Sequence, residues 1–324
     1  MKPKGVPKMR NIIAAIIFSF IFSFMLAFST FASNYGKVVF VESEGNRFHI
    51  ATMNPDGTDV TVLTKEPGEY ENPRWSPDGK RIAYNKFDDE NKAYQLWMMN
   101  SDGSSPEIIS NSSYWGAAWS PDSKKIAFMT MNNGMLVIMD LKTREITPLV
   151  DAAAMPVWSP DGKTIVYEPI SLSPQTLYLI DPVTQRKWNI DLTERGIAIY
   201  HKKWSPVAFS PDDQKIAFLG ASLIKSTWGI YIMDSDGTNV IEKYTGNDGG
   251  LFAQWPTWSP DGKQIMFDTR RGIEKMDVDG EVPTLVRPNG MEPDWLNSPS
   301  AASVSPQSKT ATTWGYVKHD SSKK

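Results

Sequence analysis

The sequence of 324 residues contains no cysteine, only three histidines and no Gly-x-Ser-x-Gly motif. The absence of cysteine excludes disulfides, thiolate metal sites, cysteine nucleophiles and lipid attachment at a cysteine. His49, His201 and His319 are too far apart in the chain to form a metal-ligand pattern. The missing serine motif removes the usual nucleophile of α/β-hydrolases. We therefore predict no bound metal and no cofactor.

The chain also lacks an excess of basic residues. Its 34 lysines and arginines stand against 37 aspartates and glutamates, which gives a formal net charge of −3. The N-terminal stretch up to Ala32 carries four of the basic side chains and no acid, so the rest of the chain is more acidic still. Because an acidic surface repels the phosphate backbone, we do not expect nucleic acid as a partner.

One long hydrophobic run is present, at the N-terminus. A basic stretch at residues 2–10 is followed by an apolar run at residues 12–28 and by small residues up to Ala32. This layout is typical of a secretory signal peptide. We therefore predict that residues 1–32 are a signal peptide and that the chain is exported, to the periplasm or the extracellular space. The alternative is an uncleaved anchor formed by residues 12–28, the one case in which membrane contact is expected.

A repeated unit dominates the rest of the chain. Its pattern is Pro-x-Trp-Ser-Pro-Asp-Gly-Lys-x-Ile-Ala-Tyr/Phe, and copies occur at residues 72–84, 116–128, 155–167, 206–218 and 255–267. The anchoring aromatics are Trp75, Trp119, Trp158, Phe209 and Trp258, at spacings of 44, 39, 51 and 49 residues. The Ser-Pro-Asp-Gly segment predicts a β-turn, because proline fixes φ and glycine accepts a positive φ. Short strands alternating with such turns at this spacing are typical of four-stranded propeller blades.

The two ends of the repeat region complement each other. Strands two, three and four of an incomplete blade are matched by residues 37–41, 47–53 and 60–63. Residues 292–296 match the missing first strand, with Trp295 at the anchoring position. We therefore predict an all-β fold for residues 37–296. It is a six-bladed β-propeller of four-stranded antiparallel blades, closed by pairing the N-terminal strands with a C-terminal strand.

The repeated serines, aspartates and tryptophans are interpreted as structural. An active site is needed once, whereas the Ser-Pro-Asp motif recurs in every copy, so its residues are assigned to turns. The anchoring aromatics, Trp295 included, are expected to pack between blades rather than to stack on sugars. Residues 297–324 are rich in Ser, Thr, Ala and Lys, and we predict a disordered tail there. The propeller is expected to be a monomer.

Length variation between copies falls on one side of the predicted propeller. The turns within each copy lie on one face, and the loops between strands two and three and between blades lie on the other, here called the loop face. Variable loops on a rigid scaffold commonly carry recognition. The aromatic residues expected there as binding contacts are Tyr70, Tyr114, Trp115, Tyr200, Phe252 and Trp255. The alternative is that Trp115 and Trp255 only cap the ends of inner strands.

The repeated Pro-x-Trp-Ser-Pro-Asp-Gly-x-x-Ile-Ala-Phe string resembles the C-terminal propeller of the TolB family and its WD-like relatives. The resemblance covers about Lys37 to Leu296. This resemblance is specific for the fold, but it says little about the function. Periplasmic binding components, the propeller domains of prolyl peptidases and uncharacterised exported proteins all carry this repeat.

Two functions remain open from the sequence. The first is a non-catalytic binding or scaffold propeller for a protein, a peptide or a cell-envelope polymer, which the lack of a catalytic set favours. The second is a propeller enzyme, a glycan hydrolase or lyase, acting through carboxylates at the channel mouth. The candidates for that chemistry are Glu69, Glu71, Asp88 and Asp89. Two carboxylates brought together in the channel would favour the enzyme, and a plugged channel would count against it.

Overall fold

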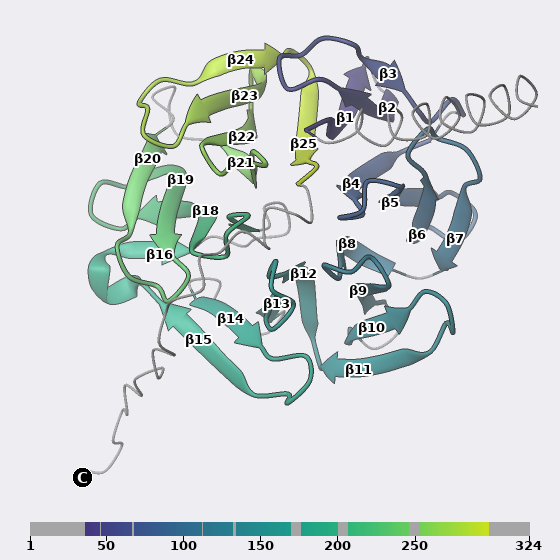
Figure 1. Cartoon of the computed structure of the whole chain (residues 1–324), viewed down its shortest axis with the longest axis horizontal. Helices are drawn as coiled ribbons and strands as arrows, with labels where there is room; N and C mark the ends of the chain where they lie inside the picture. The colour runs from purple at the N-terminus through teal and green to yellow at the C-terminus, as the bar shows by residue number, and fades with distance from the viewer. Residues whose placement is uncertain are drawn as a thin grey trace, which may run out of the picture.

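Six antiparallel sheets stand around a central axis in the computed structural model, as the blades of a propeller (Figure 1). The structure describes residues 36–45, 47–66, 68–111, 113–131, 134–169, 176–199, 207–245 and 253–297, without the side chains of residues 113–115 and 154. Helical structure within these ranges amounts to one 3-10 turn, η1 (Thr193–Arg195). The predicted all-β fold with six blades is confirmed.

The blades are numbered in chain order, and their strands are given from the innermost outwards. Blade 1 contains β25 (Gly290–Trp295), β1 (Val38–Glu44), β2 (Arg47–Met53) and β3 (Thr61–Val62). Blade 2 contains β4 (Tyr70–Trp75), β5 (Arg81–Asp88), β6 (Ala93–Asn100) and β7 (Glu107–Ser110). Blade 3 contains β8 (Ser113–Trp119), β9 (Lys125–Thr130), β10 (Leu136–Asp140) and β11 (Ile146–Val150).

The remaining three blades follow the same order. Blade 4 contains β12 (Ala153–Trp158), β13 (Ile165–Pro169), β14 (Thr176–Ile180) and β15 (Lys187–Asp191). Blade 5 contains β16 (Ile197–Ile199), β17 (Ala208–Phe209), β18 (Lys215–Ser222), β19 (Thr227–Asp234) and β20 (Ile241–Thr245). Blade 6 contains β21 (Gln254–Trp258), β22 (Gln264–Thr269), β23 (Gly272–Asp277) and β24 (Thr284–Arg287).

Blade 1 closes the ring by joining the two ends of the described chain. Figure 1 shows β25 lying beside β1 after the chain has passed through the other five blades. The two strands pair antiparallel, with Trp295 opposite Val38 and Gly290 opposite Glu42. Beyond the strand, the N–H of Leu296 donates to the carbonyl of Lys37 at 2.9 Å. Hydrogen bonds between distant parts of the sequence therefore hold the ring closed, as predicted.

Blade 5 differs from the predicted pattern in its innermost strand. The repeat predicts one strand ending at Phe209, but two segments pair with β18 in its place. β16 lies opposite Gly220–Ser222, and β17 lies opposite Ile216 and Ala217. Residues 200–206, which connect the two segments, lie outside the described residues. Both segments fit because β18, with eight residues, is long enough to pair with each of them.

A β-bulge interrupts the innermost strand in the five blades where that strand is described in full. The bulge residue stands three positions before the anchoring aromatic and has a left-handed backbone, with φ between 50° and 85°. These residues are Asn72, Gly116, Met155, Trp255 and Glu292. In blade 2, the register against β5 shifts between Glu71 and Arg74. A bulge turns backbone N–H groups out of the ladder, so these groups need acceptors from elsewhere.

The hydrophobic core is divided into clusters between neighbouring blades. Trp258 of blade 6, for example, packs with Ala217 and Ile232 of blade 5, and its Nε1 donates to the carbonyl of Ala208 at 3.0 Å. The anchors that pack in this way against the preceding blade are Trp75, Trp119, Trp158, Phe209, Trp258 and Trp295. Each anchor therefore joins two blades, which explains why the repeat places a large aromatic at this position.

The Ser-Pro-Asp turns are held by their serine side chains. In blade 6, Ser259 Oγ donates to Asp261 Oδ1 at 2.7 Å and accepts from the N–H of Gln264 at 2.9 Å. The serines that make the same pair of bonds are Ser76, Ser120, Ser159 and Ser210. All five are buried, so these hydroxyls are part of the fold and are not available as nucleophiles.

Replacing Ser259 by alanine is expected to lower the free energy of unfolding by about 1–2 kcal/mol, because a buried turn N–H loses its acceptor. Urea unfolding followed by circular dichroism measures the change. Ser104→Ala is the control, since Ser104 is exposed in an outer turn, and it is expected to change the value by less than about 0.5 kcal/mol. An equal loss in both variants would contradict a special role of the buried hydroxyl.

The predicted signal peptide, residues 1–32, lies outside the described residues, as does the chain from residue 298 onwards. Within the part of the chain that is described, no helix has the length and apolar character needed to cross a membrane.

Candidate functional site in the central channel

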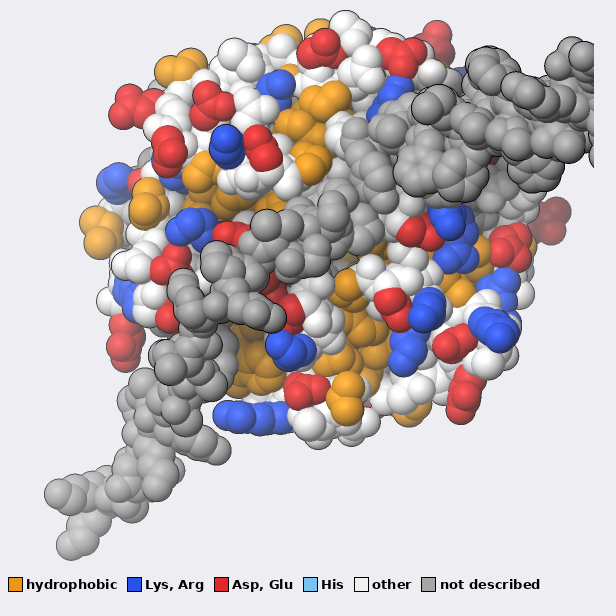
Figure 2. Space-filling view, viewed as in Figure 1, with side chains coloured by type: hydrophobic (Ala, Val, Ile, Leu, Met, Phe, Trp, Pro, Cys, Tyr) orange, Lys and Arg blue, Asp and Glu red, His pale blue; other side chains and the backbone are white. Residues whose placement is uncertain are grey.

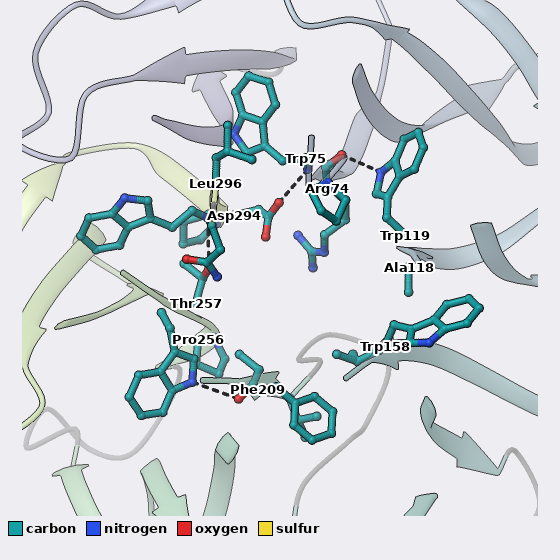
Figure 3. A pocket seen from close by; sticks show the side chains of 18 of the residues that line it. Arg74, Trp75, Ala118, Trp119, Trp158, Phe209, Pro256, Thr257, Asp294 and Leu296 are labelled. Carbon is teal, nitrogen blue, oxygen red and sulfur yellow. Dashed lines mark hydrogen bonds between the residues drawn. The ribbon is translucent and has the colours of Figure 1, made fainter. Parts of the chain in front are cut away.

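A cavity of about 200 Å³ lies at one end of the central channel, where the innermost strands run into the Ser-Pro-Asp turns. The last residues of these strands line it from all six blades (Figure 3). Most residues on its wall are anchoring aromatics, prolines, alanines and valines, while polar atoms contribute as much of the exposed surface as apolar atoms do. The polar side chains on the wall are Arg74, Thr257, Asp294 and Asn297. An apolar pocket with a few converging polar groups is the usual form of a binding site.

Arg74 and Asp294 are the two charged residues on this wall. Figure 3 shows the guanidinium of Arg74 and the carboxylate of Asp294 pointing towards the centre of the ring, from β4 and β25 respectively. Asp294 Oδ2 accepts from the N–H of Trp75 at 2.7 Å, so its carboxylate also joins blade 1 to blade 2. Burial raises the pKa of Asp294, and the positive charge of Arg74 opposes that rise.

The channel is crossed by side chains below this cavity. The guanidinium carbon of Arg74 lies 4.7 Å from the ring centroid of Trp255, a cation–π contact between β4 and β21. Trp255 in turn packs in one buried cluster with Met129 and Met155. These three residues belong to blades 6, 3 and 4, so their contact passes across the axis of the ring.

Three further carboxyl groups lie beside the bulges near the channel. Glu292 Oε2 accepts from the N–H of Asn72 at 2.6 Å, and Asp268 Oδ2 accepts from the N–H of Glu292 at 3.2 Å. Glu71 Oε1 accepts from the hydroxyl of Tyr94 at 2.9 Å. Two of the three therefore provide acceptors for the N–H groups that the bulges turn out of the ladder.

Desolvation shifts the protonation of this acidic group. Burial raises the pKa of Glu292 to about 8, and the neighbouring carboxyl of Glu71 adds to the rise. Burial likewise raises the pKa of Asp268 to about 7. The pKa of Glu71 is also raised by burial, and its bond from Tyr94 opposes the shift. At neutral pH the group therefore holds protons that free carboxyls would have lost.

The chemistry available here is limited by these bonds. Each of the three carboxyls accepts a hydrogen bond from another strand. Among the described residues, no group of three or more His, Cys, Asp or Glu side chains is arranged to hold a metal ion. The bonds that the structure shows for these carboxyls hold strands and blades together.

Sequence comparison gives partial matches. No family model matches the chain. The Tol-Pal system protein TolB of Nitratidesulfovibrio vulgaris is 36% identical over 61 residues, which is 18% of this chain and 14% of that protein. An uncharacterised protein of Agrobacterium fabrum is 30% identical over 138 residues, which is 37% of this chain and 46% of that protein. The chain thus matches less than half the length of either relative.

Structural comparison extends the similarity to most of the propeller. TolB from Acinetobacter baumannii superposes with a TM-score of 0.66 at 21% identity, over 81% of this chain and 67% of that one. The chain resembles the TolB propellers in sequence and in fold. A chain of a nidogen–laminin complex gives a TM-score of 0.61 at 9% identity, covering 81% of this chain and 98% of that one. An oligogalacturonate lyase in complex with manganese gives 0.53 at 14%, covering 78% and 74%. These structures establish a shared fold, which hosts different functions.

Two of the six aromatics predicted as contacts of this TolB-like propeller are described, and both are buried. Tyr70 is 3% exposed, stacks on His49 at 6.4 Å between ring centroids, and donates to the carbonyl of Glu66 at 3.2 Å. Trp255 is also 3% exposed and carries the Arg74 contact. The side chains of Tyr114 and Trp115, together with all of Tyr200 and Phe252, lie outside the described residues. A contact role for the six aromatics stays a prediction.

The four carboxylates proposed for an enzyme do not form one group, although the charge of Glu69 helps to raise the pKa of Glu71. Among the four, Glu71 is the one that belongs to the half-buried acidic group with Asp268 and Glu292. Glu69 and Asp89 are exposed. Asp88 accepts from Gln95 Nε2 at 2.9 Å beside the turn between β5 and β6.

Sequence reasoning missed Arg74, Asp294, Asp268 and Glu292. A signal for two of them was present in the repeats. The position before the anchoring aromatic is occupied by Ala118, Val157, Ala208 and Thr257 in four blades. Arg74 and Asp294 place opposite charges at this position in two blades, and the ring closure makes those blades neighbours.

Proposed function

We propose that this chain is an exported, non-catalytic binding propeller that holds part of a protein, peptide or cell-envelope polymer at the cavity end of its channel. The observation that carries the proposal is the cavity of about 200 Å³, lined by aromatic and small apolar residues, with Arg74 and Asp294 on its wall. Such a site buries an apolar group and orients it through a few polar contacts. On the face shown in Figure 2, charged side chains are most frequent towards the outer rim, and larger hydrophobic areas are visible nearer the centre.

Three further points support a binding role. The layout of residues 1–32 favours export. The channel carboxyls serve as acceptors for strands and a tyrosine. The N. vulgaris relative is a Tol-Pal system protein, which makes an envelope protein the first partner class to test.

Site-specific cross-linking tests the proposal. Because the sequence contains no cysteine, only the introduced residue carries the cross-linker. A single cysteine carrying a photo-cross-linker is introduced at Asn297 on the cavity wall, at Asn91 on the loop face, or at Val183 in an outer turn. We expect a defined adduct with an envelope component at position 297 and none at position 183. Recovery of that adduct should fall at least tenfold when Ala208→Phe fills the cavity. An adduct at position 91 alone would move the site to the loop face, and no adduct at any position would contradict a binding function.

A propeller enzyme is the second candidate. The raised pKa values of Glu292 and Asp268 favour it, because such groups can act as acids or bases near neutral pH. The fold shared with an oligogalacturonate lyase suggests the substrate to try. Our proposal expects no unsaturated product, measured by ultraviolet absorbance, when the protein is incubated with oligogalacturonate. Turnover that Glu292→Gln abolishes would show that the protein is an enzyme and would contradict the proposed non-catalytic function.

A further inference from the structure

We infer that the cavity also binds the aromatic segment Trp314–Tyr316 of the chain's own C-terminal region, which thereby competes with the partner. The inference rests on the proposed function, because it uses the same cavity as a binding site. Residues 298–324 lie outside the described residues, and their sequence contains two large aromatic side chains, Trp314 and Tyr316. Two features of the cavity match this segment: its position and its volume.

The position matters because the described chain ends at the cavity itself. Leu296 and Asn297, the last described residues, are both part of the cavity wall. The connection from Asn297 to Trp314 consists of residues 298–313. A connection of this length can span up to about 55 Å when extended, so it is long enough for the aromatic residues to return to the point where the segment starts. Tethering at this length corresponds to an effective concentration on the order of millimolar, so even weak binding would fill the site.

The volume suits one aromatic side chain. An apolar protein cavity of about 150 Å³ takes up benzene, and this cavity of about 200 Å³ has room for the larger indole ring. Thr257 and Asp294 provide oxygen atoms on the wall that can accept the indole N–H. Trp314 is therefore the residue that fits best, with Tyr316 next to it at the rim.

Peptide binding to the full chain tests the inference. The full-length variant carrying Trp314→Ala and Tyr316→Ala frees the cavity, and a fluorescein-labelled synthetic peptide of residues 306–320 is titrated onto it. We expect saturable binding, and at least tenfold weaker binding of the same peptide with alanine at both aromatic positions. The wild-type chain should bind the intact peptide at least threefold more weakly than the variant does, because its own segment competes.

Two cavity variants locate the site. Ala208→Phe and Val157→Phe, in blades 5 and 4, fill the cavity from different sides, and each should weaken peptide binding at least tenfold. Val183→Phe, at a residue that is 86% exposed in an outer turn, is the matched control and should leave it unchanged. Circular dichroism and thermal unfolding show that each variant is folded. Equal binding of the intact and the alanine peptides, or equal binding to filled and unfilled cavities, would overturn the inference.

The two proposals can fail separately. If Ala208→Phe abolishes the cross-linked adduct while the peptide does not bind, the proposed function stands and the inference is wrong. If the peptide binds in the cavity while Ala208→Phe leaves the cross-linked adduct unaffected, the segment occupies the cavity and the partner binds elsewhere.

Discussion

Replacing Trp258 by alanine is expected to lower the free energy of unfolding by about 3–5 kcal/mol, the usual cost of truncating a buried tryptophan. The side chain is 1% exposed and lies between blades 5 and 6, where it packs with Ala217 and Ile232. Its loss leaves a cavity between blades and removes the N–H that donates to the carbonyl of Ala208 at 3.0 Å. Urea and thermal unfolding of the two proteins, followed by circular dichroism, measure the difference.

Trp158→Ala is the matched control, because Trp158 holds the same position in blade 4. Its indole is only partly buried, and its Nε1 donates to the carbonyl of Gly162 in its own turn at 3.2 Å. We expect about half the loss seen for Trp258, because less surface is buried and no bond between blades is broken. Equal losses would show that the repeat position alone sets the contribution, whatever the burial of the ring.

Most of the fold could be predicted from the repeat, because its turn and anchor residues act locally and recur in each copy. Each Ser-Pro-Asp turn fixes a hairpin, and each anchoring aromatic fixes one contact between blades, so the spacing of Trp75, Trp119 and the later copies predicts the ring. Closure was predictable for the same reason, since Trp295 occupies an anchor position that the N-terminal strands lack.

The departures from the repeat depend on pairing that is not local. β16 (Ile197–Ile199) has three residues, too few to show a strand period, and it exists because β18 extends beyond its pairing with β17. The bulges have no residue signature, because the left-handed position holds side chains as different as Asn72, Met155 and Glu292. Their common cause is the geometry of the innermost strand, which sequence patterns do not reveal.

The candidate site follows from the same non-local geometry. Arg74 and Asp294 lie near opposite ends of the described chain and become neighbours because those ends pair. Glu292 and Asp268 gain their raised pKa values from burial, which depends on the finished ring. The sequence could reveal unusual charges at repeat positions, but it could not show that bulge N–H groups would bind them.

Replacing Glu292 by glutamine is expected to make the protein more stable than wild type above pH 8, by about 2 kcal/mol. The pKa of this carboxyl is raised from an ordinary 4.5 to about 8, chiefly by burial. The folded state therefore binds a proton that the unfolded state releases. The contribution of Glu292 to stability is complete below pH 4.5 and is lost as the pH rises through 8. The full shift corresponds to about 5 kcal/mol, and we expect less than half because the side chain keeps some contact with solvent.

Glutamine keeps an oxygen that accepts the N–H of Asn72, so the two proteins should have similar stability at pH 5 and diverge towards pH 9. Chemical unfolding at several pH values in this window measures the difference between them. The raised pKa values of Asp213 and Glu168 act equally in both proteins, so the difference reports on Glu292 together with its interactions with Glu71 and Asp268. Glu69→Gln, at an exposed glutamate, is the control and should run parallel to wild type at every pH. Parallel curves for Glu292→Gln as well would mean that this carboxyl is ionised in the folded protein at neutral pH. The strand that closes the ring would then hold its charge against Asp268 and Glu71, balanced by Arg74.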